Sequence, residues 1–184
     1  TCDMCKEEKF SECEITNPSV EMEKMLMGQK TAGLLGFSHY SGGYPGCHAE
    51  YVRIPFADVN LLKIPLELSD EKAIFLSDVL PTAWQATEMA EVSEGKTVAV
   101  WGLGPIGLMT MEFAKHRGAS RVIGIDCVPY RLEVAKNRGF EVINFKEEEP
   151  VGTLLKMIPH GPDCVIDCVG FRYAKSWRHT LEKA

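Results

Sequence analysis

Three cysteines crowd the start of the sequence. Cys2, Cys5 and Cys13 follow the spacing C-x2-C-x7-C within the polar stretch TCDMCKEEKFSEC. Closely spaced thiolates in a short irregular segment are typical ligands of a structural zinc site, which normally takes four protein ligands. A disulfide pair or reduced thiols would leave the same pattern, and spacing alone favours zinc no more than these two states together. Asp3 or a neighbouring glutamate could complete a metal set, but a fourth cysteine before Thr1 is the simpler expectation.

A second group of residues has the spacing of a dinucleotide-binding turn. Gly102, Gly104 and Gly107 form G-x-G-x-x-G in WGLGPIG, between a strand-like and a helix-like run. Gly102 allows a tight turn, Gly104 lets the backbone approach a pyrophosphate, and Gly107 lets the helix pack closely on the strand. The helix N-terminus would stabilise the phosphates, and Pro105 is acceptable in its first turn. The glycine pattern is a weak motif when taken alone.

Asp126 strengthens this interpretation. It ends the next strand-like run, 24 residues after Gly102. A carboxylate there can accept hydrogen bonds from the adenine ribose hydroxyls and would repel a 2′-phosphate, which favours NAD over NADP. Arg131 could cover the ribose or the pyrophosphate. The alternatives are a capping or turn aspartate for Asp126 and a solvated helix face for Arg131.

The elements that would position these residues alternate regularly after residue 95. Short apolar runs predict strands, and the amphipathic segments between them predict helices. Strands buried on both faces between such helices indicate a doubly wound parallel sheet. The expected order is strand 97–102, helix 105–118, strand 121–126, helix 129–139, strand 141–145, helix 149–158 and strand 163–170.

The first half of the chain has a different sequence pattern. Glycines and prolines punctuate short extended stretches, and AEYVRIP (49–55) and LLKIP (61–65) are β-like runs. We therefore expect part of a β-rich domain. A helix should follow, capped by Ser69 and favoured at its N-terminus by Asp70 and Glu71. Pro81 should break or restart that helix.

Composition limits the classes of function. The chain has 184 residues and a formal net charge of -6, which disfavours binding to nucleic acid or to an anionic membrane. No apolar run is long enough for a membrane helix, and Thr1 begins no signal-peptide pattern. The seven cysteines are an odd number and are scattered through the chain, which suits a reducing compartment. These features predict a cytoplasmic protein.

Several motifs, taken in order, carry a family resemblance. The cysteine pattern, GGYPGCHAEYVRIPFADVNLLKIP, LSDVLPTAW, VAVWGLGPIG and VIGIDCVPYRLEVAK together resemble the zinc-dependent medium-chain alcohol dehydrogenases. The nearest branch contains glutathione-independent formaldehyde dehydrogenase, and the resemblance covers all but about the last dozen residues. It implies an α/β chain. Residues 1–94 would be the C-terminal part of a GroES-like β-rich catalytic domain, with a structural-zinc lobe at 1–28 and linking helices, and residues 95–184 the first part of a Rossmann NAD-binding domain.

The resemblance also implies roles for single residues. Cys2, Cys5 and Cys13 match the last three of four structural-zinc cysteines. Asp78, within LSDVLPT, matches the third ligand of a catalytic zinc, and a charge buried on that apolar helix would need a compensating partner such as a metal. The alternative for Asp78 is a capping or salt-bridged aspartate. Cys47 and His48 are predicted to be structural.

Three further positions match the family's cofactor contacts. Thr82 corresponds to a residue that contacts the nicotinamide, Ile106 to one that lines the phosphate turn, and Val169 to one beside the adenosine. Each of them, taken singly, fits a helix cap or a core residue equally well.

The implied function is NAD-linked oxidation of an alcohol or aldehyde by a zinc-dependent enzyme that forms a homo-oligomer. Two catalytic zinc ligands and the later strands of the sheet are expected outside this chain, so no catalytic set is complete and the chain alone should be inactive. A non-catalytic nucleotide-binding or zinc-lobed interaction module is an alternative. A threonine or polyol dehydrogenase of the same family is another.

Overall fold

The computed structural model describes residues 2–170, without the side chains of residues 20, 26 and 27. In its second half, four parallel strands form a sheet in the order β3-β2-β1-β4. Val98 of the central strand β1 pairs with Val122 on one side and with Cys164 on the other. The predicted α/β fold with a doubly wound parallel sheet is confirmed. The strands are β1 (Thr97–Trp101), β2 (Arg121–Asp126), β3 (Glu141–Asn144) and β4 (Cys164–Asp167).

A helix follows each of the first three strands, as predicted. These helices are α6 (Pro105–His116), α7 (Pro129–Asn137) and α8 (Pro150–Met157). Each begins with a proline at its first position, where the backbone N–H has no partner within the helix and the fixed φ of proline suits helix initiation. Glu149 also caps α8 by accepting hydrogen bonds from the N–H groups of Val151 and Gly152.

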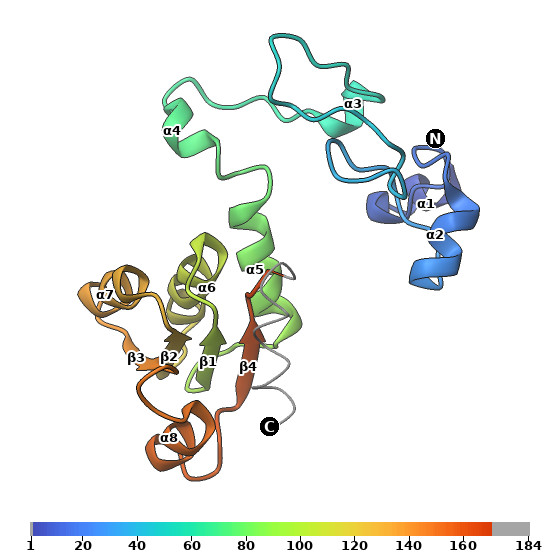
Figure 1. Ribbon diagram of the computed structural model, residues 1–184. Helices are drawn as coiled ribbons and strands as arrows, with labels where there is room; N and C mark the ends of the chain where they lie inside the picture. Colours follow the sequence, from blue (N-terminus) through green and yellow to red (C-terminus); the bar gives the residue numbers. More distant parts are fainter. Residues whose placement is uncertain (1, 171–184) are drawn as a thin grey trace. The chain divides into compact units, whose positions relative to one another are not determined.

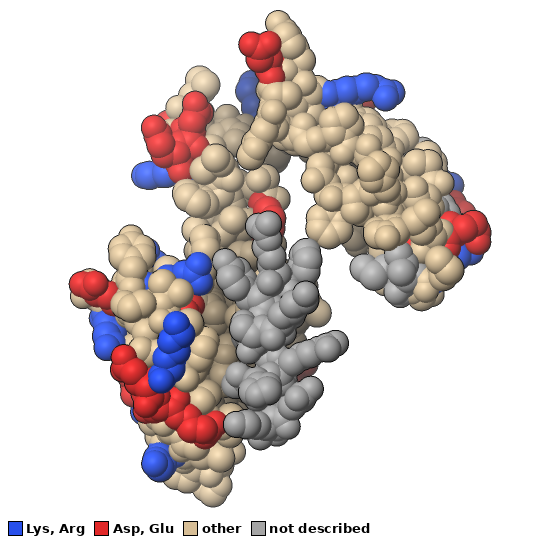
Figure 2. All heavy atoms as spheres, viewed as in Figure 1, with Lys and Arg blue, Asp and Glu red and all other residues tan. Residues whose placement is uncertain are grey.

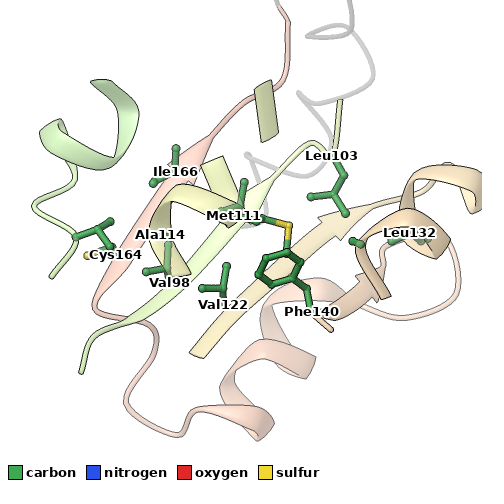
Figure 3. Packing of buried hydrophobic residues seen from close by; sticks show 12 residues of the cluster. Val98, Leu103, Met111, Ala114, Val122, Leu132, Phe140, Cys164 and Ile166 are labelled. Atoms are coloured by element: carbon green, nitrogen blue, oxygen red, sulfur yellow. The ribbon is translucent and has the colours of Figure 1, made fainter. Parts of the chain in front are cut away.

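The sheet has an apolar layer on each face. One layer joins the sheet to α6 and α7 and includes Val98, Met111 and Phe140. Figure 3 shows these side chains among the labelled residues of this layer. The other layer joins Ile123 and neighbouring residues of the sheet to Leu154 of α8. Both faces of the sheet are therefore packed against helices.

Two helices precede the sheet. Helix α4 (Asp70–Ala73) starts after Ser69, as predicted, and α5 (Val79–Met89) lies beside α6 (Figure 1). The predicted interruption is present, but the helix restarts before Pro81 and not after it. Pro81 falls in the first turn of α5, where its missing N–H costs no helical hydrogen bond.

The described residues divide into two compact units, a first that ends at Lys63 and a second that begins at Ile64. The first contains α1 (Asp3–Lys6), a 3-10 helix (Phe10–Glu12), α2 (Val20–Met27) and α3 (Ala57–Asn60). The expectation of strands at 49–55 and 61–65 is wrong, because within residues 2–63 the backbone pairing is an isolated bridge between Leu35 and Tyr44. These runs have strand-like composition, but a strand also needs a neighbour to pair with.

The division between the two units falls after Lys63, so α4 and α5 group with the sheet. The domain boundary after residue 94 remains a prediction, and residues 171–184 of the second predicted domain lie outside the described part. Acidic and basic side chains are interspersed on the face of the sheet unit seen in Figure 2. Among the described residues, no helix is both long and apolar enough to cross a membrane.

Candidate functional site

Two glycines of the turn after β1 are required by the backbone itself. Gly102 has φ +84°, and a Cβ built on it would lie 2.5 Å from Cγ2 of Val169. A Cβ on Gly107 would lie 1.8 Å from the carbonyl oxygen of Gly102. Real Cβ atoms essentially never approach other atoms so closely. A side chain at Gly102 would press on the segment after β4, in a backbone conformation that favours glycine, and a side chain at Gly107 would force the first turn of α6 away from the end of β1. These two residues build the turn.

Gly104 differs from its two partners. It is the N-cap residue of α6, with φ -69° and ψ -173°, values that any residue adopts. A Cβ at Gly104 would meet no atom within 4 Å. The fold therefore does not need glycine here, whereas a ligand that approaches the helix N-terminus closely would need it.

Asp126, at the end of β2, holds the neighbouring turns together. It is only 4% exposed. Its Oδ2 accepts a hydrogen bond from the N–H of Leu103 (2.7 Å), and its Oδ1 accepts from the N–H groups of Cys127 (2.6 Å) and Val128 (2.9 Å). A carboxylate has about four acceptor positions, so about one remains for a ligand hydroxyl. Asp126 is thus a turn aspartate in this structure, and it keeps acceptor capacity as well.

Arg131 lies close to this carboxylate. Its Nη1 is 3.6 Å from Oδ2 of Asp126, and its side chain is 39% exposed. The sequence left open whether Arg131 belongs to a site or to a solvated helix face. The structure places it beside Asp126, with further N–H groups that could bind other partners.

A cavity of about 320 Å³ joins these residues at the carboxyl edge of the sheet. Of the residues predicted to bind cofactor, it brings together Gly102, Gly104, Pro105, Ile106, Asp126, Arg131 and Val169. Gly107 lies under the turn and does not line the cavity, and neither does Thr82. Ligands of open parallel sheets bind at this edge, next to the central strand where the chain reverses its direction of winding.

Five lining residues were missed by sequence reasoning: Cys127, Val128, Phe145, Cys168 and Gly170. All of them follow the carboxyl ends of β2, β3 or β4, so the rule that ligands bind at that edge could have found them. Burial raises the pKa of Cys168, although a hydrogen-bond contact with Thr110 acts in the opposite direction. Cys168 is therefore a neutral thiol in the wall of the cavity.

Asp78 and Thr82 lie together at the N-terminus of α5. The Thr82 hydroxyl donates a hydrogen bond of 2.7 Å to Oδ1 of Asp78. Both residues are exposed, so the expectation that Asp78 is a buried charge in need of compensation is wrong. Asp78 is the N-cap residue that precedes α5, so the apolar run around it in the sequence does not bury it.

The three N-terminal cysteines meet in space. The Sγ atom of Cys2 lies 3.5 Å from that of Cys5 and 4.0 Å from that of Cys13, and the three sulfurs all lie within 4.8 Å of one another. Zinc bound tetrahedrally at about 2.3 Å from each sulfur requires sulfur–sulfur distances of about 3.8 Å. The donor set therefore fits such an ion. Cys47 and His48 are exposed.

Neighbouring hydrogen-bond donors lower the pKa of one of these thiols, Cys13. Burial opposes ionisation of Cys13, but hydrogen bonds from the Thr16 hydroxyl and from the N–H groups of Ile15 and Thr16 outweigh it and lower its pKa to about 6. Hydrogen bonds with Cys2 and Cys13, together with burial, raise the pKa of Cys5 to about 11. A Cys13 thiolate close to two further sulfurs is a favourable starting point for binding a cation.

Comparison with known proteins gives a consistent picture. Residues 105–182 match the family model described as zinc-binding dehydrogenase. A zinc-type alcohol dehydrogenase-like protein of Schizosaccharomyces pombe is 40% identical over 185 residues, which cover 100% of this chain and 44% of that protein. A glutathione-independent formaldehyde dehydrogenase of Pseudomonas aeruginosa is 37% identical over 92% of this chain and 41% of its own length.

The solved structures agree. Alcohol dehydrogenase TADH from Thermus sp. ATN1 superposes with a TM-score of 0.80 at 36% identity and covers 99% of this chain and 48% of that one. Benzyl alcohol dehydrogenase from Acinetobacter calcoaceticus gives a TM-score of 0.56 at 29% identity over 59% of this chain and 31% of that one. The chain thus spans somewhat less than half the length of the relatives that it matches.

Proposed function

Because the chain belongs to the zinc-dependent alcohol dehydrogenase family, we propose that the protein carrying it oxidises an alcohol or aldehyde hydrate and transfers the hydride to NAD. The observation that carries the proposal is the cavity at the carboxyl edge of the sheet, where an open glycine turn and a buried carboxylate face the same space. When bound, zinc would supply Lewis-acid polarisation of the substrate oxygen, and the nicotinamide would accept the hydride.

The phosphate turn would hold the pyrophosphate. Gly104 leaves its side of the turn open, and the N–H groups at the start of α6 offer donors to an anion. Ile106 and Val169 would contribute apolar walls beside the turn and the adenosine. In this proposal the residues act only by binding and orienting the cofactor.

Asp126 would accept a ribose hydroxyl, and this is the basis for preferring NAD. A 2′-phosphate would place negative charge beside a carboxylate that is 4% exposed and already ordered by three N–H groups. Arg131 neutralises part of that charge, but its 3.6 Å contact is directed to the same carboxylate. The balance favours a neutral ribose.

Asp78 is proposed as a ligand of the catalytic zinc, and Thr82 as a contact of the nicotinamide. The support is their family position together with the 2.7 Å hydrogen bond that orients the Asp78 carboxylate. A bound Thr82 hydroxyl leaves the second oxygen of Asp78 available for a cation. Cys2, Cys5 and Cys13 are proposed as ligands of a separate structural zinc.

The partners follow from the same family. Relatives named alcohol dehydrogenase and formaldehyde dehydrogenase support a small alcohol or aldehyde as substrate. A homo-oligomer and a cytoplasmic location belong to the proposal as well.

The direct test is activity of the whole protein. We expect NAD-linked oxidation of at least one member of a panel of alcohols, polyols and aldehydes, followed by absorbance of the reduced cofactor. Absence of turnover on the whole panel, in zinc-loaded protein that binds NAD, would instead favour a non-catalytic nucleotide-binding module.

Zinc content tests the ligands separately. Asp78→Ala should lower bound zinc by about one equivalent, as should Cys13→Ser, because a site that loses one of its few ligands binds metal far more weakly. Asp70→Ala is the matched control for Asp78→Ala, since Asp70 is an exposed aspartate in the first turn of α4. Zinc content that stays unchanged in Asp78→Ala would remove Asp78 from the site.

A further inference from the structure

Helices α5 and α6 run in the same direction and end together. The N–H of Gly95, in the turn after α5, donates a hydrogen bond of 2.9 Å to the carbonyl oxygen of Gly118, just past α6. Since both C-termini lie at the amino edge of the sheet, both N-termini lie at the carboxyl edge. One N-terminus carries Asp78 and Thr82, and the other carries the phosphate turn (Figure 1).

Arg117, the residue that follows α6, fastens these helices to each other. Its Nη1 forms an ion pair with Glu88 of α5, and its Nε donates a hydrogen bond of 3.1 Å to the carbonyl oxygen of Val92. Its guanidinium carbon lies 4.9 Å from the centre of the Trp84 ring. Ion pair, hydrogen bond and cation–π contact thus reach three points of α5 and the turn after it.

Trp84 of α5 makes a second contact between the two helices. Its ring meets Phe113 of α6 edge to face, with centroids 5.3 Å apart, and it is 39% exposed. Trp84 stands only two residues after Thr82, on the same helix. A rotation or slide of α5 against α6 would therefore break the Trp84 contacts and move Thr82 at the same time.

We propose that Arg117 is a positioning residue that fixes the distance between the two halves of the cofactor site. Through Trp84 and Glu88 it holds α5, and so sets where Thr82 stands relative to the phosphate turn on α6. Arg117 contacts Trp84, Glu88 and Val92, none of which is proposed to contact the cofactor. This inference rests on the proposed function, in which Thr82 meets the nicotinamide and the turn meets the pyrophosphate.

The test compares NAD with ADP-ribose, which lacks the nicotinamide ring. In the whole protein, Arg117→Ala should leave the Kd of ADP-ribose unchanged within about twofold, while hydride transfer slows by roughly tenfold to a hundredfold, as small misplacements of reacting groups do. Arg117→Lys, which can keep the charge beside Trp84 and Glu88, should recover part of the rate. Arg138→Ala removes a more exposed arginine–glutamate pair, that with Glu112, and should change neither quantity.

The outcomes separate the two proposals. If Arg117→Ala weakens ADP-ribose and slows hydride transfer to the same extent, or affects only thermal stability, Arg117 is merely structural and the inference fails. If the unmodified protein binds neither ligand, the proposed function fails instead. Should Arg117→Ala not fold, Glu88→Gln removes the partner charge at a half-exposed position and should give the same pattern more weakly.

Discussion

At the scale of single residues, the three glycines of the G-x-G-x-x-G motif differ in what the backbone requires of them. Gly102 and Gly107 are required by the backbone, because a Cβ on either would overlap neighbouring atoms. Gly104 has ordinary dihedral angles and open space around it. Two of the glycines thus serve the fold, as the sequence predicts, and Gly104 is the one whose missing side chain the proposed cofactor contact would use.

This difference can be measured with Gly104→Ala. Its free energy of unfolding should stay the same or rise by up to about 1 kcal/mol, because alanine fits the backbone and restricts the unfolded chain. Its Kd for NAD should rise at least about tenfold, equivalent to 1.4 kcal/mol, because the methyl group occupies the approach of the pyrophosphate. Urea unfolding and calorimetric titration give the two quantities. Gly107→Ala is the contrasting variant and should unfold; unchanged NAD affinity in Gly104→Ala would contradict the phosphate role.

Asp126 has a structural role and, in the proposed function, a cofactor-binding role in the same side chain. Asp126→Asn offers one acceptor oxygen in place of two, so its amide nitrogen faces at least one backbone N–H that the carboxylate now accepts. We expect the cofactor-free protein to lose on the order of 1–3 kcal/mol of stability in urea unfolding, the usual penalty for a buried donor without a partner. A residue that served only the ribose would leave this stability unchanged.

At the scale of elements, the starts of the two strands β1 and β4 are tied by one carboxylate. Oδ2 of Asp163 accepts hydrogen bonds of 2.7 Å from both the N–H and the hydroxyl of Thr97. These bonds, the backbone one first, lower the pKa of Asp163 below its ordinary value of 3.8, although burial acts the other way. The pairing of β4 with β1 is therefore sensitive to acid.

The direction of the pH dependence follows from that shift. A carboxyl whose pKa is lower in the folded than in the unfolded protein contributes stability above the unfolded pKa, and this contribution is lost as the pH falls through the folded pKa. The difference in stability between the native protein and Asp163→Asn should thus be full at about pH 7 and shrink as the pH falls below 3.8. Urea unfolding at several pH values measures it, with Asp58→Asn as an exposed control. A constant difference across this range would contradict the role of the charge.

At the scale of the whole molecule, each of the two units is stabilised internally by a different kind of interaction. Both apolar core clusters lie within residues 64–184. In residues 2–63 the described buried side chains are Cys13, Asn17, Glu23 and Ser41, of which three are polar. Glu23 accepts hydrogen bonds from Asn17 (2.7 Å) and from the N–H of Thr31 (2.9 Å). A unit with so little apolar burial depends on cross-links, and a metal is the one its cysteines suit.

Chelation should therefore loosen the first unit and leave the strands of the second unit protected. Removing zinc from the whole protein should abolish slow amide hydrogen exchange in the first unit, residues 2–63, because its local opening no longer breaks metal bonds. Exchange in the strands β1 to β4 should stay slow, since their core contains no metal ligand among the described residues. Mass spectrometry of exchanged peptides would map both regions. Equal loss of protection in both units, or in neither, would contradict a structural zinc confined to Cys2, Cys5 and Cys13.

The sequence by itself determined the alternating part of the chain and many of the residues that line the cavity at the carboxyl edge of the sheet. Strand-length apolar runs, prolines at helix starts and glycines at fixed spacing are local signals, so the four strands, the three helices between them and seven of the lining residues could be found without coordinates. The cysteine cluster was also visible, because its members are close in the chain.

Only the tertiary structure decided the rest. Residues 49–55 have the composition of a strand, yet no neighbour pairs with them in the described unit, and pairing depends on residues distant in sequence. Asp78 lies in an apolar run but is exposed at a helix start, and burial is set by what packs against a residue and not by its own neighbours in the chain. For the same reason Arg117 carries no local signal: its role comes from Trp84, Glu88 and Val92, which only folding brings to it.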